Sequence, residues 1–211
     1  MKKDLLCLLD LEKQDFEMLF KRAIELKKRY EKGIMDTLLT GKTLGLIFDK
    51  KSTRTRVAFE TAMIQMGGHP IYMSTQDTQI SRAEPAKDTA RVLSRYIDCL
   101  AMRTFDHALV EEFAQTSSIP VINALTDSFH PCQILSDIMT IIEQKGGYAN
   151  VRIAWVGDGN NVANSWINAA SVLGLDLILA CPDGYQIDPA ILDVASEKGQ
   201  TSQIKFTNDP K

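Results

Sequence analysis

The residues with the clearest chemical potential lie in one short run, FDKKSTRTR at residues 48–56. The run follows a compact apolar segment and opens a helical pattern, so backbone N–H groups at the positive end of a helix would meet hydroxyl and guanidinium groups. Ser52, Thr53 and Thr55 offer neutral donors, and Arg54 can hold a phosphate group through two charge-assisted hydrogen bonds. The run therefore predicts an anion-binding turn that suits a phosphate group.

This run also has a plainer interpretation. Ser52 could simply cap a helix whose arginines face solvent. The apolar strand before the run and the helix after it favour the phosphate interpretation, because strand-turn-helix units commonly bind phosphate at that position. Arg56 is expected to point back and brace the turn rather than to bind the anion.

Three further polar residues are expected at the same edge of the predicted sheet. His130 precedes Pro131, which suits the first turn of a helix, and Gln133 follows in that turn. Arg103 ends the apolar run at residues 97–103. Each residue alone has an ordinary interpretation as a cap or a surface side chain. Ligands collect at the carboxyl edge of open α/β sheets, so their convergence beside a phosphate turn favours a binding role.

Apolar runs that alternate with helical patterns must position these residues. An amino-terminal helix, capped by Asp10 and ending at Gly33, carries an apolar face at three- and four-residue steps. Strands are then predicted at residues 43–48, 69–73, 97–103 and 119–124, and helices at 54–66, 85–96, 106–115 and 131–145. Continuous apolar strands of this kind predict a parallel sheet with helices on both faces.

The pattern restarts after a break at residues 145–147. It predicts strands at residues 151–158, 175–182 and 203–209, and helices at 161–173 and 189–198. Three strands are few for a sheet that stands alone. The sequence thus predicts an α/β protein with two doubly wound parallel-sheet domains, residues 1–145 and 148–211, of which the second is truncated.

Composition limits the partners. Hydrophobic residues make up 45% and charged residues 24% of the 211 residues, as in folded globular proteins. A net charge of −3 gives no broad cationic surface, so neither nucleic acid nor an anionic membrane is an expected partner. No signal peptide or apolar run of ~20 residues is visible, which makes the cytoplasm the expected compartment. The four cysteines show no disulfide or zinc spacing.

Several motifs together resemble a known family. Residues 48–55 match the carbamoyl phosphate signature of the aspartate and ornithine carbamoyltransferases, and the match continues through MRTF around Arg103 and HPCQ at 130–133. DTARVLSRY at 88–96 and GDGNNVANSW at 157–166 extend it along essentially the whole chain. GDGNNV and HPCQ are typical of the ornithine branch rather than the aspartate branch.

The resemblance implies a carbamoyl phosphate site. The residues that would hold the phosphate are Ser52, Thr53, Arg54 and Thr55. Arg103 would bridge the phosphate and the carbamoyl oxygen, His130 would also contact that oxygen, and Gln133 would bind the carbamoyl amide. Thr55, Arg103 and His130 would be the catalytic donors.

The resemblance also implies a second substrate and an assembly. Asn161 would contact L-ornithine, whose side-chain amine would accept the carbamoyl group to give L-citrulline and phosphate in arginine metabolism. Gln79, in the polar loop STQDTQISRAE at 74–84, would reach the site of a neighbouring subunit in a homotrimer. Synthesis and breakdown of arginine are not separated by the sequence.

The residue types suit this reaction without a cofactor. Attack of a neutral amine develops negative charge on the carbamoyl oxygen, and each preorganised donor there can contribute about 3 to 4 kcal/mol. No metal ion and no covalent nucleophile are required. Cys132, although it lies inside the HPCQ motif, is expected to be a packing residue.

Three alternatives stay open. GDGNNV resembles the start of a dinucleotide fingerprint, with Asp183 as a ribose-binding acid, but its third glycine is missing. Relative to the family, the sequence stops partway through the second domain, so a chain that binds carbamoyl phosphate without turnover is also possible. The acceptor amine could be aspartate or putrescine instead of ornithine.

Overall fold

The structure is a computed structural model that describes residues 3–74 and 84–210. The chain divides into two compact units, which are described separately. The first unit comprises Met1–Leu6 and Arg22–Asp127, and the second comprises Cys7–Lys21 and Ser128–Lys211. This division differs from the expected domains, 1–145 and 148–211, because helix α5 (Pro131–Lys145) packs against α6 (Asn161–Leu173) of the second unit. The expected domain boundaries stay a prediction.

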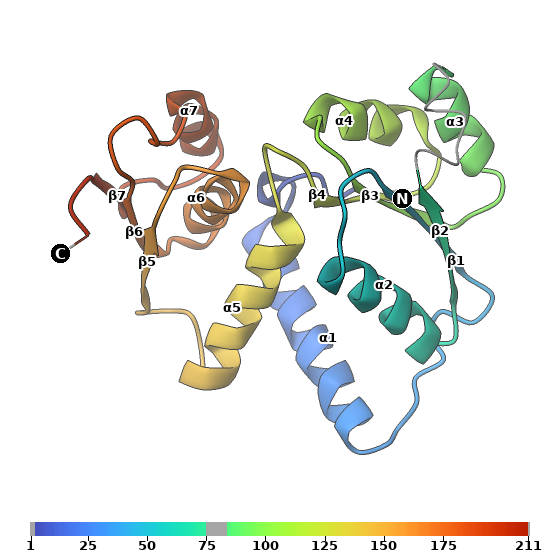
Figure 1. Cartoon of the computed structure of the whole chain (residues 1–211). Helices are drawn as coiled ribbons and strands as arrows, with labels where there is room; N and C mark the ends of the chain where they lie inside the picture. The colour runs from blue at the N-terminus through green and yellow to red at the C-terminus, as the bar shows by residue number, and fades with distance from the viewer. Residues whose placement is uncertain (1–2, 75–83, 211) are drawn as a thin grey trace. The chain divides into compact units, whose positions relative to one another are not determined.

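The first unit is built on a parallel sheet of four strands in the order β2-β1-β3-β4 (Figure 1). The strands are β1 (Thr43–Phe48), β2 (His69–Ser74), β3 (Cys99–Arg103) and β4 (Val121–Leu125). The helices that connect them are α2 (Arg54–Gln65), α3 (Ala86–Leu93) and α4 (His107–Thr116). This order places β1 and β3 side by side, so the segments that follow them leave the sheet at adjacent points.

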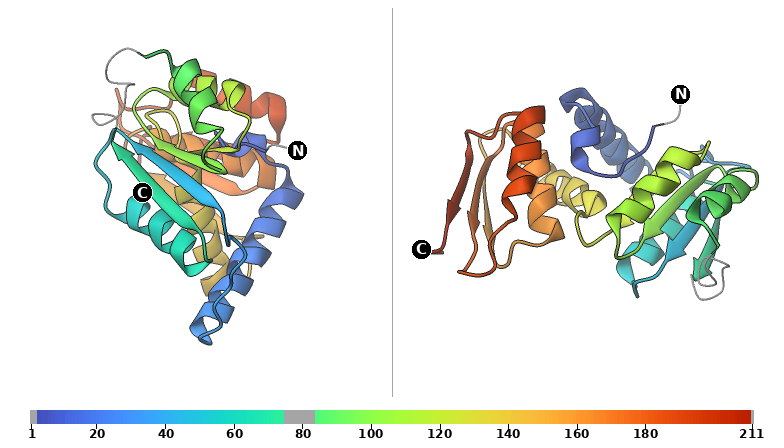
Figure 2. Two further views of the ribbon diagram at one scale, coloured as in Figure 1. Left: turned by 90° about the vertical axis from the view of Figure 1, so that its right-hand side faces the viewer. Right: turned by 90° about the horizontal axis from the view of Figure 1, so that it is seen from above.

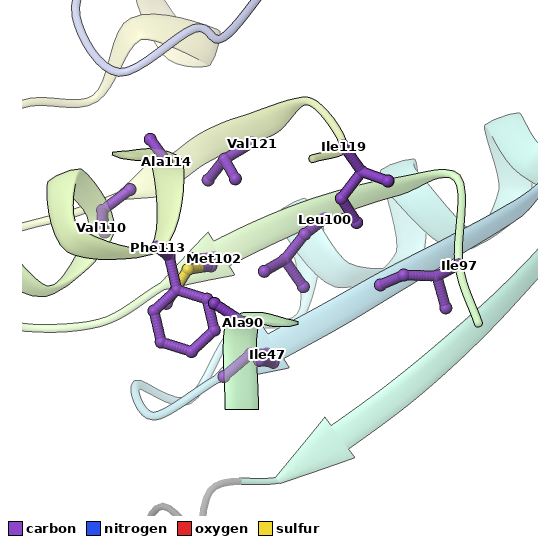
Figure 3. Packing of buried hydrophobic residues seen from close by; sticks show 10 residues of the cluster. All are labelled: Ile47, Ala90, Ile97, Leu100, Met102, Val110, Phe113, Ala114, Ile119 and Val121. Atoms are coloured by element: carbon purple, nitrogen blue, oxygen red, sulfur yellow. The ribbon is translucent and has the colours of Figure 1, made fainter. Parts of the chain in front are cut away.

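Helices cover this sheet on both faces. On one face, Ile47, Leu100 and Met102 pack against Ala90 of α3 and Phe113 of α4 (Figure 3). On the other face, strand residues pack against Met63 and Phe59 of α2; the strand residues are Leu44, Leu46, Phe48, Ala101 and Ala124. Successive residues of β1 and β3 therefore serve opposite cores, which explains why both strands are apolar along their length.

The second unit contains a parallel sheet of three strands in the order β5-β6-β7. The strands are β5 (Arg152–Val156), β6 (Asp176–Ala180) and β7 (Ile204–Thr207), and the unit also holds the short helix η1 (Leu8–Asp10). Helix α6 and helix α7 (Pro189–Lys198) lie on the same face of this sheet (Figure 2). Ala154 and Val156 are exposed, Val156 by 64% of its surface, so part of β5 has no cover within the described residues.

The α/β class and the two parallel sheets expected from the sequence are confirmed. The expected helices 131–145 and 161–173 coincide with α5 and α6. One local expectation was wrong. Asp10 does not cap α1 (Lys13–Glu31); it lies in η1, where its carboxylate accepts from the Cys7 N–H at 2.9 Å. Asp15 instead accepts from the Glu12 N–H at 3.0 Å, which stabilises the start of α1. Across the described ranges, every helix is too short or too polar to span a bilayer.

Candidate active site

The start of α2 leaves its backbone N–H groups open. Thr53 occupies the N-cap position without a side-chain capping hydrogen bond. Ser52 is half-buried and makes no hydrogen bond within the described ranges, so the alternative of a helix capped by Ser52 is not what the structure shows. The first N–H groups of an α-helix have no partner within the helix. The turn therefore presents unused donors and hydroxyl groups together, as an anion site requires.

Two arginines meet at this turn. Arg103, the last residue of β3, points a guanidinium nitrogen at the Thr55 hydroxyl oxygen, 3.4 Å away. Burial lowers the pKa of Arg103, and the positive charge of Arg54 lowers it further. Neither Arg54 nor Arg103 forms an ion pair with any residue that the structure describes, and the Nε atom of Arg103 is buried without an acceptor. The two like charges and the open donor favour a bound anion.

Arg56 turns away from this anion site. Its Nε atom donates to the Glu60 carboxylate at 2.8 Å, and its guanidinium lies 3.6 Å from the ring centroid of Tyr72 on β2. The hydrogen bond and charge of Glu60 raise the pKa of Arg56 above its ordinary value. As expected, Arg56 has a bracing role, although it braces α2 against the edge strand rather than the turn itself.

In the second unit, His130 and Gln133 lie at the start of α5. His130 is buried at the N-cap position, Pro131 occupies the first turn, and the His130 N–H donates to the Ser165 hydroxyl at 2.8 Å. The exposed Gln133 side chain donates to Asp137 at 2.8 Å. Burial raises the pKa of Asp137. The helix start thus carries an imidazole and an amide, both of which can contact a polar ligand.

Asn161 is the first residue of α6, and Asn160 caps that helix by accepting from the Val162 and Ala163 N–H groups. The Ser165 hydroxyl donates to the Asn161 carbonyl at 2.8 Å. Because the same hydroxyl accepts from His130, it ties the starts of α5 and α6 together. Ser165 was not among the expected site residues; its position four residues after Asn161 on the same helix is the signal that could have indicated it.

The structure thus places the expected site residues in two sets. The first unit brings together Ser52, Thr53, Arg54, Thr55 and Arg103. The second unit brings together His130, Gln133 and Asn161. Gln79 lies outside the described residues.

Family models match both parts of the chain. The model described as "Aspartate/ornithine carbamoyltransferase, carbamoyl-P binding domain" matches residues 3–143. The model described as the "Asp/Orn binding domain" of the same enzymes matches residues 149–211. The chain belongs to the aspartate/ornithine carbamoyltransferase family. The resemblance read from the motifs is confirmed, and the chain is a carbamoyltransferase by descent.

Relatives from distant organisms share this similarity. An ornithine carbamoyltransferase of Syntrophus aciditrophicus is 56% identical over 210 residues, which cover 100% of this chain and 69% of the relative. One from Archaeoglobus fulgidus is 46% identical and covers 99% of this chain and 67% of the relative. The solved ornithine carbamoyltransferase of Pyrococcus furiosus superposes with a TM-score of 0.93 at 44% identity, over 99% of this chain and 67% of that one.

In this member of the carbamoyltransferase family, the glycine motif at 157–159 has a packing role. A Cβ atom on Gly159 would lie 2.6 Å from the Ile187 nitrogen and 2.7 Å from the Gln186 carbonyl carbon. The Gly159 N–H also donates to the Tyr185 carbonyl at 2.7 Å. Glycine is therefore needed here because the chain's own backbone approaches closely. The motif does not require a dinucleotide to explain it.

Cys132 shows no sign of a reactive role. Burial raises the pKa of its thiol to about 12, so the thiol stays protonated near neutral pH. A nucleophilic cysteine needs a lowered pKa, because the thiolate is the reactive form. The raised pKa agrees with the packing role expected for Cys132 within the HPCQ motif.

Proposed function

We propose that this chain binds carbamoyl phosphate at the start of α2 and transfers the carbamoyl group to the side-chain amine of L-ornithine. The products are L-citrulline and phosphate. The observation that carries the proposal is the pairing of Arg54 and Arg103 beside Thr55 at an uncapped helix start, without a carboxylate partner among the described residues. Such a site favours a compact dianion.

Phosphate binding has a clear electrostatic basis. Arg103 is half-buried and its charge is destabilised by burial and by Arg54. A phosphate group that contacts both guanidinium groups would remove their mutual repulsion and satisfy the buried Nε atom of Arg103. Ser52 and Thr53, whose side chains make no capping bond, would supply neutral donors to the remaining phosphate oxygens.

The transfer step needs donors at the carbamoyl group. When the ornithine amine attacks the carbamoyl carbon, a new C–N bond forms and negative charge develops on the carbamoyl oxygen. Arg103, Thr55 and His130 would stabilise that oxygen, and Gln133 would orient the carbamoyl amide. The C–O bond to phosphate then breaks, the departing phosphate accepts the proton that the attacking nitrogen loses, and the phosphate leaves as an anion whose charge Arg54 and Arg103 would offset.

Ornithine is the proposed acceptor for two reasons. Relatives that are 46% and 56% identical to this chain over the aligned residues are ornithine carbamoyltransferases. The second family model describes a domain that binds aspartate or ornithine, and it includes Asn161, which would contact the amino acid. The same proposal includes a homotrimer in which Gln79 serves a neighbouring site, a cytoplasmic location and a role in arginine metabolism.

An assay of citrulline formation tests the proposal. The purified chain would be incubated with carbamoyl phosphate and, in parallel, with ornithine, putrescine, aspartate or acetylornithine. We expect carbamoyl transfer with ornithine to exceed transfer with the other three amines. Transfer to a different amine would reject the ornithine assignment, and failure to bind carbamoyl phosphate would reject the proposed site.

A second candidate is a chain that binds carbamoyl phosphate without turnover. It is favoured by the incomplete cover of the second sheet, since Val156 on strand β5 is exposed by 64% among the described residues. Calorimetric binding of carbamoyl phosphate together with no citrulline from any of the four amines would identify this case.

A further inference from the structure

Asp49 and Thr104, two residues outside the expected site, link the segments that follow the carboxyl ends of β1 and β3. The Asp49 N–H donates to the Arg103 carbonyl at 2.8 Å, one residue beyond the pairing of Phe48 with Arg103. The Thr104 hydroxyl then donates to the Asp49 carboxylate at 2.7 Å. Thr104 is buried, with 3% of its surface exposed. The two strands are thus joined at this end by one main-chain bond and one charge-assisted side-chain bond.

This junction lies between the two parts of the phosphate site. Residues 50–53 lead directly from Asp49 to the start of α2, and Arg103 is the residue before Thr104. The Arg103 guanidinium also contacts the Thr55 hydroxyl directly, in the first turn of α2. The bond between Asp49 and Thr104 therefore joins the two chain segments that carry the phosphate turn and Arg103.

A neighbouring contact reinforces the same junction. Lys50 forms an ion pair with Asp127, which follows β4, and its ammonium lies 4.4 Å from the centroid of the Phe105 ring. The Asp127 N–H donates to the Phe105 carbonyl at 3.0 Å. The segments that follow β1, β3 and β4 are thus linked to one another immediately before the phosphate turn.

We infer that Asp49 and Thr104 are positioning residues that set the spacing between Arg103 and the phosphate turn at residues 52–55. The inference rests on the proposed function, because it concerns the same carbamoyl phosphate site. Neither residue needs to contact the ligand. Their effect is to fix the geometry in which Arg54, Thr55 and Arg103 can bind one phosphate group together, and small displacements of such groups weaken binding and catalysis.

The direction in which Asp49→Asn changes phosphate binding distinguishes a positioning role from a purely electrostatic one. A carboxylate close to an anion site opposes anion binding, so removal of the Asp49 charge should strengthen phosphate binding if electrostatics alone matter. A positioning role predicts the opposite, namely weaker binding in Asp49→Asn. Thr104→Val removes the hydroxyl donor with almost no change in shape or net charge, and it therefore isolates the hydrogen bond. Thr104→Ser restores a hydroxyl group.

The opposite end of the same two strands offers a matched control. Asp98 precedes β3, and its carboxylate accepts from the Thr43 N–H at 2.8 Å and from the Lys42 ammonium at 2.7 Å. This is also an aspartate clamp between β1 and β3, but it lies at the amino-terminal edge of the sheet. Asp98→Asn should weaken the clamp without moving the phosphate turn.

The experiment titrates the full 211-residue chain with carbamoyl phosphate, and separately with inorganic phosphate, by calorimetry. Thermal unfolding without ligand shows which variants stay folded. We expect Thr104→Val and Asp49→Asn to bind both ligands about threefold to tenfold more weakly, because the bond that fixes the site is lost in the first variant and is reduced to a bond with a neutral amide oxygen in the second. Thr104→Ser and Asp98→Asn should bind like the unmodified chain.

The outcomes separate this inference from the proposed function. If the unmodified chain binds neither ligand, the proposed function fails and the inference fails with it. If the unmodified chain binds and folded Thr104→Val binds equally well, the inference alone is wrong. Tighter binding by Asp49→Asn, or equal losses in Asp98→Asn and Thr104→Val, would also overturn it. Should Thr104→Val fail to fold, the sign of the change in Asp49→Asn decides the question.

Discussion

At the scale of single residues, the site depends on two arginines that form no ion pair with any described residue. Arg56 has Glu60 and Tyr72 as partners, whereas its neighbour Arg54 and the nearby Arg103 have no ion-pair partner among the described residues. Burial and the positive charge of Arg54 lower the pKa of Arg103, because both disfavour its charged form. The partners of the three arginines thus distinguish the bracing residue Arg56 from Arg54 and Arg103, which are proposed to bind the anion.

The first prediction concerns Arg54. Arg54→Ala should weaken binding of carbamoyl phosphate by roughly tenfold or more, because charge-assisted hydrogen bonds contribute about 1.5 to 3 kcal/mol each. Thermal unfolding should change little, since the Arg54 side chain is exposed and makes no hydrogen bond or ion pair within the described ranges. Arg91→Ala is the control, because Arg91 is an exposed helical arginine paired with Asp88. Normal calorimetric binding by folded Arg54→Ala would show that the anion site was misassigned.

A second residue-scale prediction concerns Gly159. A methyl group at this position would lie 2.6 Å from the Ile187 nitrogen, so Gly159→Ala must displace backbone. We expect a loss of about 1 to 3 kcal/mol in the free energy of unfolding, as for other overpacked positions. Gly147→Ala is the control, because a methyl group there would meet open space. Urea denaturation of both variants gives the comparison, and equal stability would contradict the packing role of Gly159.

At the scale of elements, local signals predicted helices better than they predicted contacts. Pro131 and Gly146 mark the two ends of α5, and Asn160 and Gly174 mark those of α6, which is why the expected bounds coincide with the observed ones. The bond between Asp49 and Thr104 joins residues 55 positions apart. No local pattern specifies such a partner, because it exists only after β1 and β3 have paired.

The third prediction concerns pH and the edge of the first sheet. Hydrogen bonds from Lys42 and from the Thr43 N–H hold the pKa of Asp98 below its ordinary value of 3.8. Between 3.8 and the lower folded value, the unfolded chain binds more protons than the folded chain, so stability falls as the pH falls through this window. Asp98→Asn should therefore be less stable than the unmodified chain above pH 3.8, and the difference should shrink below it. Urea unfolding at several pH values measures this difference, and a constant difference would contradict the assignment.

At the scale of the whole molecule, the two units carry different parts of the proposed reaction. The first unit holds the residues for the phosphate group, namely those at 52–55 and Arg103. The second holds His130 and Gln133, which would contact the carbamoyl group, and Asn161, which would contact the amino acid. Motif spacing selected these residues, but it did not predict that the HPCQ motif would group with the second unit, because that grouping depends on the packing of α5 against α6.

This division leads to the last prediction, which compares two ligands. Inorganic phosphate carries only the group that the first unit would bind, whereas carbamoyl phosphate also carries the amide that Gln133 would bind. Gln133→Ala should therefore leave inorganic phosphate binding unchanged and weaken carbamoyl phosphate binding by roughly fivefold to tenfold, as expected for one lost hydrogen bond of about 1 kcal/mol or slightly more. Gln144→Ala is the matched control, because Gln144 is an exposed glutamine near the other end of α5. Calorimetric titration of each variant with each ligand gives four affinities. Equal weakening of both ligands in Gln133→Ala would show that Gln133 supports the fold or the phosphate turn rather than the carbamoyl group, and no weakening at all would remove it from the site.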